Sequence, residues 1–176
     1  MKKYLLISLL LVFCFACSSG RVKTSSAVDC STIVLKDFSL EGTAIQENVD
    51  VKAFAGTLPP KFSEMVKEYL VAMKVSQKIV IEKAGEKGSY ENPIIVDGSF
   101  TKITAGSTAA RLLVGFGAGS STVGAEYTIK DSSGKELGKF KKNSHTASGV
   151  RGIYAIESDA RYLAKYVATT IKNLIK

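Results

Sequence analysis

Histidine and cysteine, which ligate transition metals and act as catalytic base and nucleophile, are scarce in this sequence. It has one histidine, His145, and three cysteines, of which Cys14 and Cys17 lie in an apolar leader. If the leader is processed, Cys30 is the one thiol left to the folded chain, so neither an intramolecular disulfide nor a clustered Cys/His metal site can form. One histidine at the end of an expected strand is also weak evidence for a catalytic triad. We therefore expect no enzyme, no cofactor and no metal, with Cys30 as a small buried hydrophobic residue.

Nucleotide-binding loops are missing as well. The run GFGAGS at residues 115–120 is rich in glycine, but a dinucleotide loop requires G-x-G-x-x-G between a strand and a helix. Ser120 stands where the third glycine is needed, and the residues that follow alternate as in a strand. Gly134-Lys135 also lacks the Ser or Thr of a phosphate-binding P-loop, because Glu136 follows it. These spacings argue against both kinds of nucleotide site.

An export signal opens the chain. Two lysines precede an apolar run from Tyr4 to Ala16, which is shorter than the about 20 residues of a membrane-spanning helix. Ala16 before Cys17 resembles the bacterial lipobox, in which the cysteine is lipidated and becomes the mature N-terminus. Ordinary cleavage and an uncleaved anchor are the alternatives. The expected organisation is a signal peptide over residues 1–16, lipidated Cys17 and a flexible tether over 17–29, and a single α/β domain over 30–176.

Basic residues outnumber acidic ones, and the formal net charge is +8. In an exported protein this charge favours anionic envelope polymers or lipid headgroups, and no nucleic acid is expected in that compartment. The densest basic cluster is Lys139, Lys141 and Lys142, which a solvated strand face explains. The expected partners are the membrane, through an N-terminal lipid, and another envelope protein or an anionic envelope polymer. The sequence leaves the oligomeric state open.

Two helices are expected. Apolar residues recur three and four positions apart between Phe62 and Met73, which predicts an amphipathic helix over 59–75. Pro59 and Pro60 would lie in its first turn, where proline is tolerated. A closing helix is expected over 157–175, with Ser158 as its N-cap.

The strands follow from β-branched residues and from strict alternation, which is clearest after residue 122. Residues 41–57 are expected to be irregular. The expected strands cover 31–40, 78–83, 94–105, 122–131 and 136–145, with a parallel pair formed by the first two. Together these elements predict an α+β fold, a two-layer α/β sandwich in which a mixed five-stranded sheet carries two helices on one face.

A family resemblance becomes visible in the glycine-rich region. The motifs Asp97-Gly-Ser-Phe, Ala110-Arg111, Gly115-Phe-Gly-Ala-Gly-Ser and Asp131-x-x-Gly-Lys resemble the uncharacterised bacterial lipoprotein family called domain of unknown function 4410. The resemblance covers essentially the whole domain. The same region is more distantly similar to curli-secretion channel lipoproteins, in which hairpins grow from a similar α/β domain and assemble into an outer-membrane channel.

Arg111 is the charged residue of an otherwise apolar stretch, and a guanidinium in such a setting must find partners. It either pins the glycine loop through carbonyls or a carboxylate, or it holds an anionic group of a ligand or partner. The candidate binding residues are Arg111, Gly115, Phe116, Gly117 and Gly119.

The sequence thus favours a lipid-anchored, non-enzymatic protein of the bacterial cell envelope that binds or scaffolds another envelope component. Its expected location is the outer membrane, facing the periplasm. Two alternatives stay open. One is a channel-like oligomer that inserts residues 106–121, although this segment offers only four outward apolar positions, fewer than a membrane strand of about 9–11 alternating residues would supply. The other is a hydrolase or ligand-modifying enzyme that uses His145 or Arg111.

Overall fold

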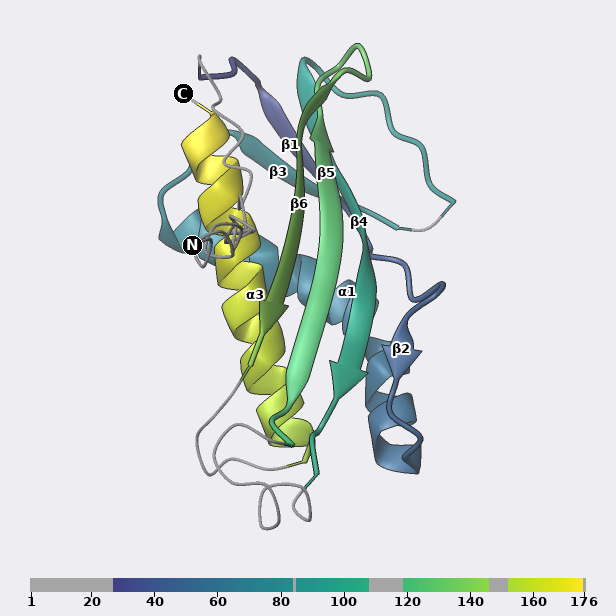
Figure 1. Ribbon diagram of the computed structural model, residues 1–176. Coiled ribbons are helices and arrows are strands. Elements are labelled where there is room, and N and C mark those ends of the chain that lie inside the picture. Colours follow the sequence, from purple (N-terminus) through teal and green to yellow (C-terminus); the bar gives the residue numbers. More distant parts are fainter. Residues whose placement is uncertain (1–26, 84, 108–118, 146–151, 176) are drawn as a thin grey trace, which may run out of the picture.

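A mixed sheet with helices on one face organises the chain. The computed structural model describes residues 27–83, 85–107, 119–145 and 152–175, and these form a six-stranded sheet against which two long helices pack (Figure 1). The predicted α+β class and mixed sheet are confirmed. The strand number differs from the prediction because a two-residue strand, β2 (Ala44–Ile45), pairs with the far end of β4.

The strand order across the main sheet is β3-β1-β4-β5-β6. The bounds are β1 Thr32–Lys36, β3 Lys78–Glu82, β4 Pro93–Thr104, β5 Thr122–Lys130 and β6 Glu136–Ser144. β1 runs parallel to both β3 and β4, which confirms the predicted parallel pair, while β4, β5 and β6 are antiparallel. The sheet is therefore parallel at one end and a meander at the other.

The alternation of buried and exposed residues along the strands shows which face of the sheet lies in the core. Val123, Ala125, Tyr127 and Ile129 of β5 are all buried, as the period-two pattern predicts. Tyr127 packs against the ring of Phe38, which in turn contacts the rings of Phe62 and Phe100. Gly98 leaves room for the Phe38 ring, because a Cβ at position 98 would lie 2.9 Å from that ring. A glycine in the middle of β4 thus lets an aromatic residue from outside the strands enter the core.

Helix α1 (Val49–Ala72) begins ten residues earlier than predicted, so the expectation of an irregular run over 41–57 is wrong. Asn48 caps it by accepting a hydrogen bond from the Val51 amide, 3.1 Å away. Pro59 and Pro60 therefore lie inside the helix. An interior proline costs about 3 kcal/mol, and burial of Val51, Ala55 and Leu58 before the two prolines returns a free energy of comparable size, at about 1.5–3 kcal/mol for each of the two larger side chains. The helix therefore continues through the prolines, and Figure 1 shows that it changes direction along its length.

Helix α3 (Ile153–Leu174) also begins earlier than predicted. Its N-cap is Gly152, at φ +64°, and no side chain caps the helix, so the prediction of Ser158 as N-cap is wrong. Ser158 is an exposed residue inside the helix. The apolar stripe predicted for this helix is confirmed, since Ala160, Leu163, Val167 and other members are fully buried.

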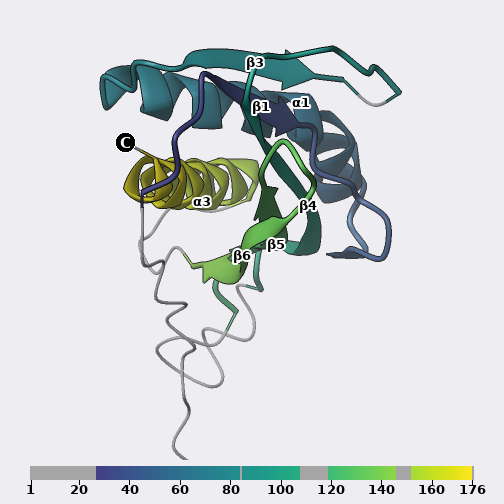
Figure 2. The ribbon, with the colours of Figure 1, turned by 90° about the horizontal axis from the view of Figure 1, so that it is seen from above.

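Within the described ranges, both helices cover the same face of the sheet, and no helix covers the other face (Figure 2). The first described residues lie beside the end of α3, where the Val28 amide donates to the Leu174 carbonyl at 2.7 Å. The hairpin end of β4 and β5 lies at the opposite pole (Figure 1). Neither helix of the described chain is long and apolar enough to cross a membrane.

Candidate functional site

The structure reaches the predicted binding segment only at its edges. Arg111, Gly115, Phe116 and Gly117 lie outside the described residues, as does the predicted lipidation site Cys17. Gly119 is described, and it stands just before β5. The roles predicted for Cys17 and for these four residues of the segment therefore stay predictions. The site is described from the residues around the segment.

The two ends of the glycine-rich segment meet at the base of the β4–β5 hairpin. Gly106 and Gly119 have φ values of +78° and +72°, and the Ser107 amide donates to the Gly119 carbonyl at 3.0 Å. A Cβ on Gly106 would lie 1.9 Å from the Gly119 carbonyl oxygen, and a Cβ on Gly119 would lie 2.2 Å from that of Ser107. This backbone crossing requires glycine at both positions. Gly119 therefore has a packing role, whatever it binds.

Gln46 ties this hairpin base to the rest of the fold. Its side-chain oxygen accepts from the Thr104 hydroxyl and from the Ala105 amide, each at 2.8 Å, and its amide nitrogen donates to the Gly106 carbonyl at 3.4 Å. Gln46 directly follows β2, and the pairing of β2 with β4 sets its position. No pattern in the sequence indicates this contact, because it depends on a two-residue strand.

His145 and Asp159 lie at the same pole but do not form a catalytic relay through their described contacts. His145 is exposed at the end of β6, as predicted, and its Nδ1 is 3.0 Å from the Thr122 hydroxyl. Asp159 is fully buried in α3 and accepts from the Ser144 hydroxyl at 3.2 Å. Neighbouring residues of a strand point to opposite faces, so Ser144 and His145 direct their side chains apart. Within the described ranges no three His, Cys, Asp or Glu side chains gather where a metal could bind.

Cys30 is buried, with 6% of its surface exposed, which confirms its predicted placement. Burial raises the pKa of its thiol, and the neighbouring Asp29 charge raises it further. A protonated, enclosed thiol is a poor nucleophile and a poor metal ligand. Cys30 therefore acts as part of the core.

The uncovered face of the sheet carries a polar hollow of about 300 Å³. Six polar side chains project there from three adjacent strands, namely Asp97, Ser99, Glu126, Thr128, Lys130 and Lys139. Lys141 hydrogen-bonds to Glu126, and this contact together with the charge of Lys141 lowers the pKa of the carboxyl. Hydroxyls, carboxylates and ammonium groups thus stand side by side. Such a surface can make many hydrogen bonds to one polar partner.

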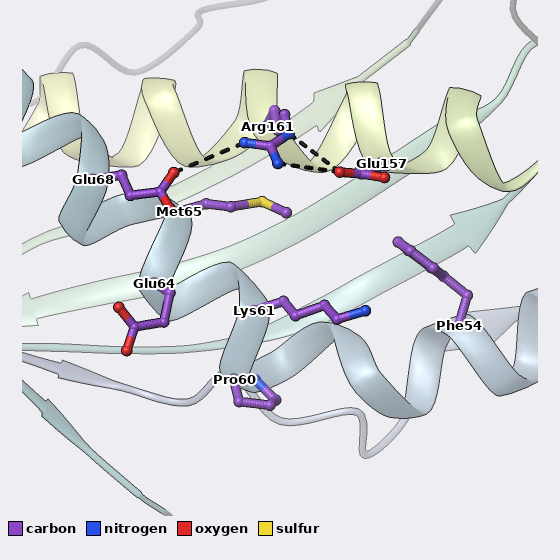
Figure 3. Close-up of a pocket in the computed structure, with 8 residues that line it drawn as sticks. All are labelled: Phe54, Pro60, Lys61, Glu64, Met65, Glu68, Glu157 and Arg161. Carbon is purple, nitrogen blue, oxygen red and sulfur yellow. Dashed lines mark hydrogen bonds and ion pairs between the residues drawn. The ribbon is translucent and has the colours of Figure 1, made fainter.

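A second hollow, of about 430 Å³, runs along the seam between α1 and α3 (Figure 3). Figure 3 shows Arg161 reaching two carboxylates, Glu157 on its own helix at 3.2 Å and Glu68 on α1 at 3.8 Å. Lys61 lies 5.7 Å from the centre of the Phe54 ring. Arg161 and its two carboxylate partners satisfy one another across the two helices, so this part of the seam is better explained as helix packing than as a ligand site.

Sequence reasoning missed the polar hollow. The signal was present in β5, where Glu126, Thr128 and Lys130 alternate with buried residues and must face the other side of the sheet. What the sequence did not supply was the order of the strands, which brings Asp97 and Lys139 beside them.

Residues 33–149 match the family described as Domain of unknown function (DUF4410), which confirms the resemblance found in the sequence. The match begins within β1 and ends after β6, so α3 lies beyond it. No curated protein matches the chain significantly. The more distant similarity to curli-secretion channel lipoproteins stays a prediction.

Several solved structures resemble the fold. Two crystal forms of the PelC dodecamer from Paraburkholderia phytofirmans superpose with TM-scores of 0.52 and 0.51 at 13% identity, covering 86% of this chain and 92% and 93% of theirs. Protein XCC0632 from Xanthomonas campestris covers 84% of this chain and 85% of its own, with a TM-score of 0.40 and 10% identity. At these identities the PelC structures show a shared fold.

Proposed function

This chain belongs to the family Domain of unknown function (DUF4410), and from that membership and its architecture we propose that it is a lipid-anchored, non-enzymatic scaffold of the bacterial cell envelope. In this proposal Cys17 carries the lipid, and the tether is the segment over 17–29 expected from the sequence. The domain self-associates and holds another envelope component. Its location is the periplasmic side of the outer membrane.

The observation that carries the proposal is the uncovered face of the sheet. A sheet face that is open to water is ordinarily polar. On this face the polar side chains are also grouped around one hollow. The acidic and basic groups are mixed there, so a partner with both hydrogen-bonding groups and charge fits better than a purely anionic one. An envelope protein is therefore the favoured partner over an anionic polymer.

The two edges of the sheet support self-association. In the described part of the chain, β3 and β6 each have one neighbouring strand, and they stand at opposite edges. Different surfaces on opposite sides of one subunit are what a closed ring of identical subunits needs. The PelC relatives are dodecamers, and that assembly supports the same type of arrangement here.

The test uses a photo-crosslinking amino acid at Thr128, on the uncovered face, in cells that make the full chain. We expect a discrete crosslinked product, and we expect the same substitution at exposed Val71 of α1 to give none. Mass spectrometry of the N-terminal peptide should show an acylated Cys17. A domain that stays solitary from both positions, or a Cys17 without a lipid, would contradict the corresponding half of the proposal.

A second candidate is a channel-like oligomer that inserts residues 106–121. The meeting of Gly106 and Gly119 favours it, because both described ends of the segment then lie side by side at the hairpin end of β4 and β5. Deletion of residues 108–118 should abolish leakage of dye from liposomes while the purified oligomer keeps its size in detergent. Intact liposomes in the presence of the undeleted protein would rule the channel out.

A further inference from the structure

The exposed side of α3 has an unusual composition. Its exposed residues include three tyrosines, Tyr154, Tyr162 and Tyr166, together with Arg161, Lys165 and Lys172. None of the exposed residues of this helix is acidic, since Glu157 is half-buried and Asp159 is buried. One exposed aromatic side chain is ordinary, but a group of them marks an interaction surface, and on this one helix 76% of Tyr154, 61% of Tyr162 and 37% of Tyr166 are exposed.

The basic character extends to the neighbouring edge strand. The ammonium group of Lys142 in β6 lies 5.1 Å from the centre of the Tyr166 ring. Lys172 reaches in the other direction and donates to the Met73 carbonyl at the end of α1. The charge of Arg161 is paired with Glu68 and Glu157, so the unpaired positive charge near the tyrosines comes from lysines beside the C-terminal half of the helix. We call Tyr154, Tyr162, Tyr166, Lys165 and Lys142 the α3 outer face.

The chain enters the domain at the end of this same helix. Val28 pairs with Ile175, and its amide bonds to Leu174. A segment of about 11 residues from Cys17 to Val28 reaches at most about 36–40 Å when fully extended. The helix itself is about 33 Å long, at 1.5 Å for each of its 22 residues. A lipid on Cys17 would therefore keep the whole α3 outer face within reach of the bilayer.

We propose that the α3 outer face docks on a phospholipid surface that carries anionic headgroups. This proposal rests on the lipid anchoring of the proposed function, because the lipid on Cys17 holds the domain close to the membrane. The side chains of the α3 outer face then make the contact. Tyrosine favours the membrane–water interface, where its ring meets the acyl boundary and its hydroxyl stays hydrated. The lysines pair with phosphate groups while their stems lie along the apolar boundary. The domain then lies on its side, with α3 parallel to the membrane.

Charge favours a lipid surface over a second copy of the chain in a symmetric contact. Two α3 outer faces placed together would bring the lysines of one copy against those of the other, and like charges in contact oppose association. An anionic headgroup layer has the complementary sign. Contact of this face with a different surface of another copy is a separate outcome that the experiment below identifies.

The test exploits the absence of tryptophan from the chain. Tyr162→Trp places one reporter in the α3 outer face, and Val49→Trp places a matched reporter at the start of α1, where Val49 is 83% exposed. The protein is the chain from residue 17 onward with Cys17→Ser, so that docking is measured without a lipid. On vesicles of phosphatidylcholine mixed with phosphatidylglycerol, we expect the Tyr162→Trp emission to shift to the blue and the Val49→Trp emission to stay unchanged.

The affinity for the same vesicles measures the charge contribution. Lys165→Ala should weaken binding about fivefold, since one lysine near an anionic surface is worth about 1 kcal/mol. Lys102→Ala, at an exposed position of β4, is the matched control and should leave binding unchanged. Added salt should weaken the wild-type interaction.

Three results would overturn the proposal. One is an equal shift, or no shift, for the two tryptophan reporters. Another is equal binding to vesicles of phosphatidylcholine alone. The third is a blue shift of Tyr162→Trp that grows with protein concentration in the absence of vesicles, which would assign the face to self-association. Because the Cys17→Ser variant used in the test carries no lipid, the outcome is independent of whether Cys17 is acylated in cells.

Discussion

Replacing Gly106 by alanine probes the crossing that closes the β4–β5 hairpin. The new methyl group would lie 1.9 Å from the Gly119 carbonyl oxygen, which is backbone and has no rotamer by which to retreat. That same oxygen accepts the Ser107 amide. The substitution therefore acts on sterics, on backbone conformation and on a hydrogen bond together.

The three costs can be estimated separately. An alanine at the φ of +78° found at Gly106 costs about 1–2 kcal/mol. Forcing the crossing strands apart costs about 1–3 kcal/mol, as overpacking does in general. Weakening the hydrogen bond between Ser107 and Gly119 costs about 1 kcal/mol. We expect Gly106→Ala to lower the free energy of unfolding by about 4 kcal/mol, if the terms add.

Gly134→Ala is the matched control. Gly134 has a φ of +84° in the β5–β6 turn, but a Cβ there would meet no atom within 4 Å. It should therefore cost only the conformational term, about 1–2 kcal/mol. Urea unfolding followed by far-ultraviolet circular dichroism compares the two variants. With a slope of about 2 kcal/mol per molar urea, their midpoints should differ by about 1 M. Equal midpoints would refute the claim that the crossing is sterically closed.

Three further substitutions test the fold and one of its charged groups. Phe62→Ala empties a fully buried site in the aromatic core and should lower the free energy of unfolding by about 3–5 kcal/mol, read from denaturant unfolding. Asn48→Ala removes the acceptor for the Val51 amide and should cost about 1 kcal/mol by the same measurement, and no loss would mean that α1 starts elsewhere. The Ser133 hydroxyl, hydrogen-bonded to Asp131, lowers the pKa of that carboxyl in the folded state, so the charged form stabilises the fold above pH about 4 and the benefit is lost as the pH falls. The stability gap between wild type and Asp131→Asn should therefore shrink on acidification, and a gap independent of pH would contradict this.

The sheet and the buried faces could be predicted from the sequence because they follow from local periodicity. Alternation from Val123 to Ile129 fixed both the strand and its inward side, and the spacing of Phe62, Met65 and Val66 fixed the buried side of α1. Each pattern reports only which side of one helix or strand is buried. It lies within a few consecutive residues, so a single sequence is enough to find it.

The starts of the helices could not be predicted in the same way. Pro59 and Pro60 are ordinary first-turn residues by local rules, and they lie inside α1 because burial of Val51 and Leu58 in the preceding turns offsets much of the proline cost. That comparison requires the tertiary structure. The Gln46 contacts at the hairpin base likewise depend on the β2–β4 pairing, which only the folded sheet creates.

The polar hollow shows the same limit for the site. Each of its strands reveals which residues face outward, but the neighbourhood of Asp97, Thr128 and Lys139 arises from the sheet order. The residues that attracted attention in the sequence, led by Arg111, lie outside the described residues. Their chemistry remains a prediction.

The closed crossing at Gly106 and Gly119 also makes the hairpin modular. The register of β4 and β5 is already set at Thr104 and Thr122, on the sheet side of the crossing. Doubling the length of a loop costs only about 0.6 kcal/mol in closure entropy. Peptides of very different length can therefore be grafted between the two glycines, whether by a protein engineer or by divergence within the family, while the sheet below keeps its pairing.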